Sequence, residues 1–204
     1  MRDIETVLFD LGGVLVDWNP RYLYRKLFKN EAEMERFLGE VCHPHWNHLH
    51  DQGMLSFANS IPDLQHRYPQ HHDEIAAWQE RWPEMLGGAI DRTVGVLEDL
   101  KKRKKVRLFA LTNWSAETWP HALERFGFLD HFDGILVSGQ EKLAKPDPRI
   151  FDLAISRFNL DPRETLFIDD NERNIQQARE LAFITHWFSD PVKLQRELIE
   201  YGLY

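Results

Sequence analysis

One short stretch constrains this chain more than any other, because it joins an apolar strand to an acid and then to a glycine turn. Residues 7–17 read V-L-F-D-L-G-G-V-L-V-D. The apolar run 7–9 shows no polar alternation, which is typical of a central strand that is covered on both faces. Asp10 follows directly, and the glycine pair 12–13 allows the backbone to turn sharply. Taken alone, the pattern fits any strand that runs into a turn, so its partners downstream decide its meaning.

The second half of the chain alternates between strand and helix patterns. Expected strands cover residues 106–111, 134–138, 165–168 and 183–188, and amphipathic helical patterns follow or separate them. Such alternation favours a parallel sheet whose strands are joined by right-handed helical crossovers. The sequence therefore predicts an α/β protein with a Rossmann-like, three-layer core built on a parallel sheet.

A long segment interrupts this sheet after its first strand. Helical patterns appear near residues 31–40, 56–67 and 72–82, whereas the histidine-rich stretch 42–53 is expected to form a loop. No strand is expected between about residues 18 and 86, and Gly87-Gly88 is expected to act as a hinge. Because about seventy residues far exceed an ordinary connection, we expect residues 18–87 to form an all-helical domain inserted into a core of residues 1–17 and 88–204.

Composition narrows the partners and the compartment. The formal net charge is −8, which argues against a nucleic-acid partner because such binding needs a basic face. The basic run 101–105 falls where a helix is expected to end, a favourable place for cations. The single cysteine, Cys42, excludes an internal disulfide and fits a reducing compartment. The sequence contains no apolar window of membrane-spanning length and no leader pattern. We therefore expect a cytoplasmic protein without a membrane partner. The sequence does not indicate an oligomeric state.

Polar residues stand at the ends of three predicted strands. Asp10 follows the first, Thr112-Asn113 the second and Asp169-Asp170 a later one, while Lys145 lies on a connecting segment. Because the carboxyl ends of parallel strands meet at one crevice, these side chains are expected to converge. Converging carboxylates repel one another unless a cation neutralises them, and Mg²⁺ favours carboxylate oxygens together with water and a substrate phosphate. The sequence thus predicts a Mg²⁺ site that receives a phosphorylated small molecule.

Four segments, in this order, resemble the motifs of the haloacid dehalogenase-like hydrolase superfamily. They are F-D-L-G-G-V-L near residue 10, L-T-N at 111–113, K-P-D-P at 145–148 and F-I-D-D-N-E-R-N at 167–174. The resemblance covers about residues 5–188, and the helical insert stands where this superfamily places its first-type cap. Within this superfamily, the chain resembles bacterial sugar-phosphate phosphatases and the phosphatase domain of soluble epoxide hydrolase.

The resemblance implies covalent catalysis. Asp10 would be the nucleophile that attacks phosphorus, giving an aspartyl-phosphate that water then hydrolyses. Thr112 and the backbone of Asn113 would hold the transferring phosphoryl group. Lys145 would pair with Asp10 and with the phosphate, which relieves the crowding of negative charge.

The resemblance also implies a metal site. Asp170 would bind Mg²⁺ together with Asp10 and the carbonyl of Gly12, and Asp169 would reach the metal directly or through water. Asn174 stands where relatives often carry another acid, so we expect it only to orient a ligand.

One position departs from the pattern of the superfamily. Most of its phosphatases carry an aspartate two residues after the nucleophile, as the acid that protonates the leaving group, whereas this chain has Gly12. A substitute would have to come from elsewhere, and the four histidines between residues 43 and 50 are one source. Their spacing matches no common zinc site, and surface or packing roles remain open. Within this stretch, His45, Trp46 and His48 are the candidates for substrate specificity.

Three functions follow from these features. The leading one is a Mg²⁺-dependent phosphatase that acts on a small phosphorylated metabolite, with sugar phosphates among the candidates. In a 2-haloacid dehalogenase, the same aspartate would attack carbon, and no metal would be needed. In a catalytically weak binding protein, this aspartate would attack neither phosphorus nor carbon. The adjacent pair Asp169-Asp170 favours the phosphatase, because loss of the leading carboxylate usually accompanies chemistry without a metal.

Overall fold

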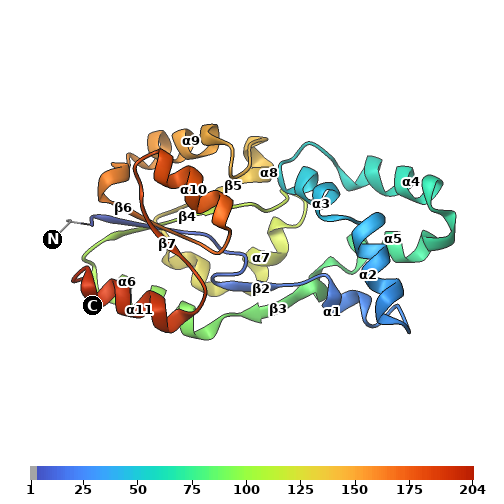
Figure 1. Cartoon of the computed structure of the whole chain (residues 1–204), viewed down its shortest axis with the longest axis horizontal. Helices are drawn as coiled ribbons and strands as arrows, with labels where there is room; N and C mark the ends of the chain where they lie inside the picture. The colour runs from blue at the N-terminus through green and yellow to red at the C-terminus, as the bar shows by residue number, and fades with distance from the viewer. Residues whose placement is uncertain (1–3) are drawn as a thin grey trace.

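A five-stranded parallel sheet forms the centre of the computed structural model, which describes residues 4–204 (Figure 1). Its strands are β1 (Thr6–Phe9), β4 (Arg107–Thr112), β5 (Gly134–Val137), β6 (Thr165–Asp169) and β7 (Ile184–Trp187). They lie in the order β5-β4-β1-β6-β7, and all neighbouring pairs are parallel. The three middle strands are almost completely buried, which explains their apolar runs without alternation.

Helices cover both faces of this sheet, so the core has three layers (Figure 1). The core helices are α6 (Asp91–Arg103), α7 (Trp119–Arg125), α8 (Ser138–Glu141), α9 (Pro148–Phe158), α10 (Glu172–Glu180) and α11 (Pro191–Glu200), with 3-10 turns at Gly127–His131 and Pro162–Glu164. Val7 and Phe9 belong to an apolar cluster with side chains of α6 and α11, whereas Leu8 belongs to a second cluster with side chains of α9 and α10. The predicted Rossmann-like α/β core is confirmed.

A second group of helices lies beyond the carboxyl ends of the strands and forms a helical cap (Figure 1). It comprises α1 (Arg21–Tyr24), α2 (Glu31–Glu40), α3 (Pro44–Asp51), α4 (Phe57–Arg67) and α5 (His72–Glu80), with 3-10 turns at Pro69–His71 and Trp82–Met85. Aromatic rings fill its interior: the ring centroid of Tyr24 lies 5.0 Å from that of Phe37 and 5.9 Å from that of Trp78. The all-helical cap agrees with the prediction, and its boundaries at residues 18 and 87 stay a proposal. Within residues 4–204, no helix is both long and apolar enough to span a membrane.

The histidine-rich stretch is a helix, so the prediction of a loop at residues 42–53 was wrong. His43 starts α3, because its Nδ1 accepts a hydrogen bond from the backbone N–H of Trp46 at 3.2 Å, and Pro44 occupies the first turn. Histidine is not among the residues usually preferred at this position, so the residue pattern contains little sign of a helix start.

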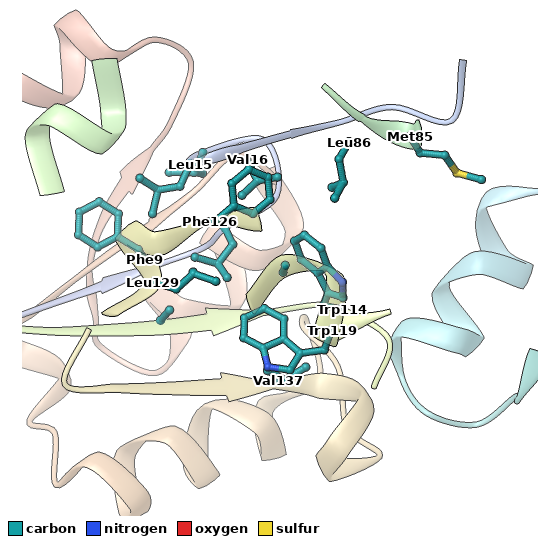
Figure 2. Packing of buried hydrophobic residues seen from close by; sticks show 14 of the residues in the cluster. Phe9, Leu15, Val16, Met85, Leu86, Trp114, Trp119, Phe126, Leu129 and Val137 are labelled. Atoms are coloured by element: carbon teal, nitrogen blue, oxygen red, sulfur yellow. The ribbon is translucent and has the colours of Figure 1, made fainter. Parts of the chain in front are cut away.

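The glycine pair 87–88 lies within a strand, and its predicted role as a hinge stays a proposal. β3 (Leu86–Ala89) pairs with β2 (Val16–Trp18) in an antiparallel ladder that carries the chain from the core to the cap and back. A Cβ at Gly87 would come within 2.3 Å of the Asp17 carboxylate, so glycine leaves room for this side chain. Apolar side chains from this ladder and from the segments around β4 and α7 pack together beneath it, among them Val16, Leu86, Trp114 and Trp119 (Figure 2).

Candidate active site

Three carboxylates meet where β1 and β6 end. In the sheet, Phe9 is paired with Ile168, so Asp10 and Asp169 emerge side by side, and the N–H of Asp10 donates to the carbonyl of Ile168 at 2.8 Å. Carboxylate oxygens of Asp10, Asp169 and Asp170 all lie within 4.8 Å of one another. The predicted convergence of these residues is confirmed, although they are separated by most of the chain.

Lys145 is the cation of this cluster, and it is buried with its side chain fully covered. Its Nζ lies 3.0 Å from Oδ1 of Asp10 and 2.7 Å from Oδ2 of Asp169, and it donates a third hydrogen bond to the carbonyl of Leu111. The side chain of Asn113 fixes the backbone of Lys145 through two hydrogen bonds of 2.9 Å, one donated and one accepted. The ion pairs of Lys145 are thus buried, and Asn113 uses its side chain to position Lys145.

The charged groups of this cluster shift one another's pKa values. Burial raises the pKa of Asp10 well above its usual value; Lys145 opposes this shift, while Asp169 and Asp170 add to it. Burial and then the charge of Asp169 raise the pKa of Asp170. Burial by itself would lower the pKa of Lys145, but the charges of Asp10 and Asp169 raise it overall. One ammonium group thus leaves the carboxylates short of positive charge, and a further cation would complete the balance.

Asp169 is held in place by the start of α10. Its Oδ1 accepts hydrogen bonds from the backbone N–H of Asn171 at 2.8 Å and from Nδ2 of Asn174 at 3.0 Å, and Nδ2 of Asn174 also approaches Oδ2 at 3.1 Å. Asn171 caps the same helix by accepting from the N–H of Arg173. Asn174 therefore lies where the sequence placed it, orienting an acid of the cluster.

The residues around the carboxylates fit a hard divalent cation. Carboxylate oxygens of Asp10, Asp169 and Asp170 lie within reach of a single ion, and Mg²⁺ prefers such oxygen donors, completed by water and a substrate phosphate. Gly13 has a φ of +74°, and a Cβ at this position would lie 2.2 Å from Oδ2 of Asp170. Glycine therefore lets the turn after β1 approach the Asp170 carboxylate.

Thr112 supplies an unsatisfied polar group on the phosphate side of the predicted site. Thr112 is completely buried at the end of β4, and its Oγ1 has no hydrogen-bond partner within residues 4–204. A buried hydroxyl without a partner costs about 1–3 kcal/mol. Binding of a phosphoryl oxygen by this hydroxyl, which the resemblance implies, stays a prediction.

A small cavity lies next to the cluster, between core and cap. It has a volume of about 80 Å³ and is lined by Gly12, Trp18, Asn47, Asp51, Trp82, Asn113 and Trp114. Asn47 and Asp51 are one helical turn apart on α3, and Nδ2 of Asn47 donates to Oδ2 of Asp51 at 2.9 Å. Sequence reasoning missed both residues, although their i,i+4 spacing would have placed them on one face of a helix.

The predicted specificity residues of the cap do not line this cavity. His45 and Trp46 line a separate groove on another side of α3, and His48 is not among the residues that line the cavity. Trp46 is buried, with its ring centroid 5.2 Å from that of Trp78. The helix turns His45 and Trp46 away from the face that carries Asn47 and Asp51, and the specificity role of the three residues stays a prediction.

Comparison with known proteins agrees with this geometry. The model of the haloacid dehalogenase-like hydrolases matches residues 4–181. This chain belongs to that family. It is 29% identical over 190 residues to a D-ribitol-5-phosphate phosphatase of Bacteroides thetaiotaomicron, covering 89% of this chain and 90% of the relative. It is 26% identical over 183 residues to a phosphorylated carbohydrates phosphatase of Thermotoga maritima, covering 86% of this chain and 81% of the relative.

A solved structure of the family shows the same fold with ligands present. A variant of a B. thetaiotaomicron family enzyme, in complex with magnesium and inorganic phosphate, superposes with a TM-score of 0.71 at 25% identity. The alignment covers 95% of this chain and 99% of that one. The shared architecture therefore extends over both the core and the cap.

Proposed function

We propose that this hydrolase releases phosphate from a small phosphorylated carbohydrate of the cytoplasm, with Asp10 carrying the phosphoryl group between two steps. One observation carries the proposal. The carboxylates of Asp10, Asp169 and Asp170 meet at one edge of the sheet, and the buried ammonium group of Lys145 forms ion pairs with Asp10 and Asp169. The named activities of the two relatives support the substrate class.

Each residue has a role that its contacts support. Oδ1 of Asp10 is held by Lys145 and by the N–H of Leu11 at 2.7 Å, while its second oxygen has no hydrogen-bond partner within residues 4–204. That oxygen is available to attack phosphorus. The hydroxyl of Thr112 and the backbone of Asn113 would bind phosphoryl oxygens, and Lys145 would reduce their repulsion from Asp10.

Mg²⁺ fits the oxygen donors of this site. Asp10, Asp170 and the Gly12 carbonyl would hold it, and Asp169 would reach it through water, because hydrogen bonds from Lys145 and Asn174 already occupy the Asp169 oxygens. When bound, Mg²⁺ would neutralise charge on the phosphoryl group.

The cavity suits the carbohydrate part of such a substrate. Trp18 and Trp114 line it. Aromatic faces pack well against the C–H groups of a sugar ring. A 2-haloacid dehalogenase, which needs no metal, would leave the carboxylate cluster without its cation.

Phosphate release separates the candidate activities. Purified protein would be given D-ribitol 5-phosphate or p-nitrophenyl phosphate, with and without Mg²⁺, and chloride release from 2-chloropropionate would be followed in parallel. We expect phosphate release that requires Mg²⁺ and falls to background in Asp10→Asn. Asp152→Asn, an exposed carboxylate on α9, is the matched control and should keep full activity. Chloride release without metal, or phosphate release that survives in Asp10→Asn, would contradict the proposal.

A further inference from the structure

The site lacks an acid where the resemblance to the phosphatases leads one to expect it. Gly12 has no side chain, and a Cβ built at this position meets no atom within 4 Å. The space beside Asp10 that a side chain at position 12 would occupy is therefore open, and Gly12 lines the cavity. An alcohol leaving group needs a proton at this place, so another residue of the cavity has to supply it.

Asp51 of the cap lines the same cavity as Gly12 and Asn113. Of the described residues that line the cavity, it alone has a carboxyl group; the others are glycine, asparagine and tryptophan. None of the histidines of α3 lines the cavity. Asp51 is thus the one lining residue able to give up and recover a proton near neutral pH.

The position of Asp51 is fixed against the core. Its carboxyl group interacts with Asn47 on the same helix and with the backbone amide of Ser115 in the segment after β4. Its backbone carbonyl accepts a hydrogen bond from the hydroxyl of Ser138, whose Oγ also accepts from the N–H of Trp114. Gly53 lies just beyond, and a Cβ there would meet the carbonyl of Gly139 at 2.4 Å. The end of α3 is therefore docked closely on the core edge of the cavity.

We propose that Asp51 is the general acid and base of the reaction, supplied by the cap in place of the residue missing at Gly12. This inference rests on the proposed phosphatase function. In the first step, Asp10 attacks phosphorus and the bond between phosphorus and the bridging oxygen breaks. That oxygen takes its electron pair and the proton of Asp51, and leaves as an alcohol.

The second step restores both carboxyl groups. The Asp51 carboxylate removes a proton from water, and the water oxygen attacks phosphorus. The bond between phosphorus and Asp10 breaks, which gives inorganic phosphate, the free Asp10 carboxylate and protonated Asp51. One water is consumed for each ester hydrolysed, and no other reactant is needed.

The surroundings of Asp51 keep its proton in place at neutral pH. Burial raises its pKa to about 8, opposed only in part by the hydrogen bonds from Ser115 and Asn47. The charged residues on the elements that pack against α3 interact with groups other than Asp51. Glu117 accepts a hydrogen bond from the N–H of Phe57 and faces His50, and Glu141 of α8 forms an ion pair with Arg157. On α3 itself, burial lowers the pKa of His48 and of His50, so neither adds positive charge beside Asp51 at neutral pH.

The test compares leaving groups of different quality in Asp51→Asn. This variant is isosteric and can still accept hydrogen bonds, so it should fold. D-ribitol 5-phosphate has a poor leaving group that needs the proton, whereas nitrophenolate leaves without one. We expect the first turnover of ribitol phosphate to slow by about 10²–10⁴-fold, and that of p-nitrophenyl phosphate by less than about 10-fold. Later turnovers of p-nitrophenyl phosphate should be slow, giving a burst of nitrophenolate.

The pH profile gives a second readout that does not depend on the variant. In the wild-type protein, first-turnover rates with ribitol phosphate should fall as pH rises above about 8, because Asp51 then loses its proton; rates with p-nitrophenyl phosphate should not. Asp73→Asn, on α5 with a fully exposed side chain, is the matched control and should behave like wild type. Equal losses for both substrates, or no loss, would overturn this role for Asp51. Failure of the wild type to hydrolyse any phosphate ester would instead overturn the proposed function.

Discussion

Replacing Lys145 with methionine would leave two buried carboxylates facing each other without their cation. The ammonium group lies within 3.0 Å of both Asp10 and Asp169, and the side chains of Lys145 and Asp169 are completely covered. Removing one partner of a buried ion pair typically costs about 3–5 kcal/mol, because the remaining charge is uncompensated. For a chain of this size, each kcal/mol shifts the melting temperature by about 2–4 °C, so Lys145→Met should melt about 6–20 °C lower.

The pH dependence of this loss follows from the direction of the shifts. The pKa of Asp10 is already raised in the folded protein by burial, and removing Lys145 would raise it further. A group with a raised folded pKa contributes stability at low pH that is lost as pH rises through that pKa. The difference in unfolding free energy between Lys145→Met and wild type should therefore be smaller at pH 5 than at pH 8. Mg²⁺ should reduce it as well, by supplying positive charge to the same carboxylates.

Urea unfolding of the wild type and both lysine variants would measure these differences. Lys101→Met is the matched control, because Lys101 pairs with Asp133 at 2.9 Å with both side chains about two-fifths exposed. Exposed pairs contribute about 0–1 kcal/mol, so this variant should lose little at either pH. If Lys145→Met lost less than about 1 kcal/mol, or if its loss did not change with pH, the description of a crowded, buried cluster would be refuted.

Two further substitutions test how the cluster is held. Asn174→Ala removes both side-chain hydrogen bonds to Asp169. It should weaken Mg²⁺ affinity by about 10–100-fold, as for other residues that orient metal ligands. A titration of activity against Mg²⁺ that matches the wild type would contradict this expectation. Gly13→Ala should weaken Mg²⁺ affinity because its Cβ would displace Asp170, whereas Gly202→Ala, at a φ of +75° in open space, should lose stability without losing Mg²⁺ affinity. Equal Mg²⁺ affinity in the two alanine variants would contradict the proposed steric effect.

The core could be predicted from the sequence because its signals are local. Strands β1, β4 and β6 are buried on both faces, which leaves uninterrupted apolar runs. Asp147 and Asn171, of residue types that commonly cap helices, do cap α9 and α10. The parallel arrangement then brings Asp10 and Asp170 together without further information.

The cap side of the site was harder to predict because its signals depend on how separate segments pack. The residues that face the cavity, Asn47 and Asp51, lie on a helix that begins at His43, an uncommon cap, so their shared face was not recognised. The burial of Lys145 depends on two hydrogen bonds from Asn113, thirty-two residues away. The open space at Gly12 likewise depends on which side chains the cap places opposite it.

The most direct test of the central claim is to look for the phosphoryl group on Asp10. The protein would be mixed with D-ribitol 5-phosphate and Mg²⁺, quenched in acid within the first turnovers, digested, and mapped by mass spectrometry. The account predicts one phosphoryl group on the peptide that contains Asp10, in wild type and not in Asp10→Asn. Phosphate released at the normal rate with no such adduct, or an adduct on a different residue, would contradict it.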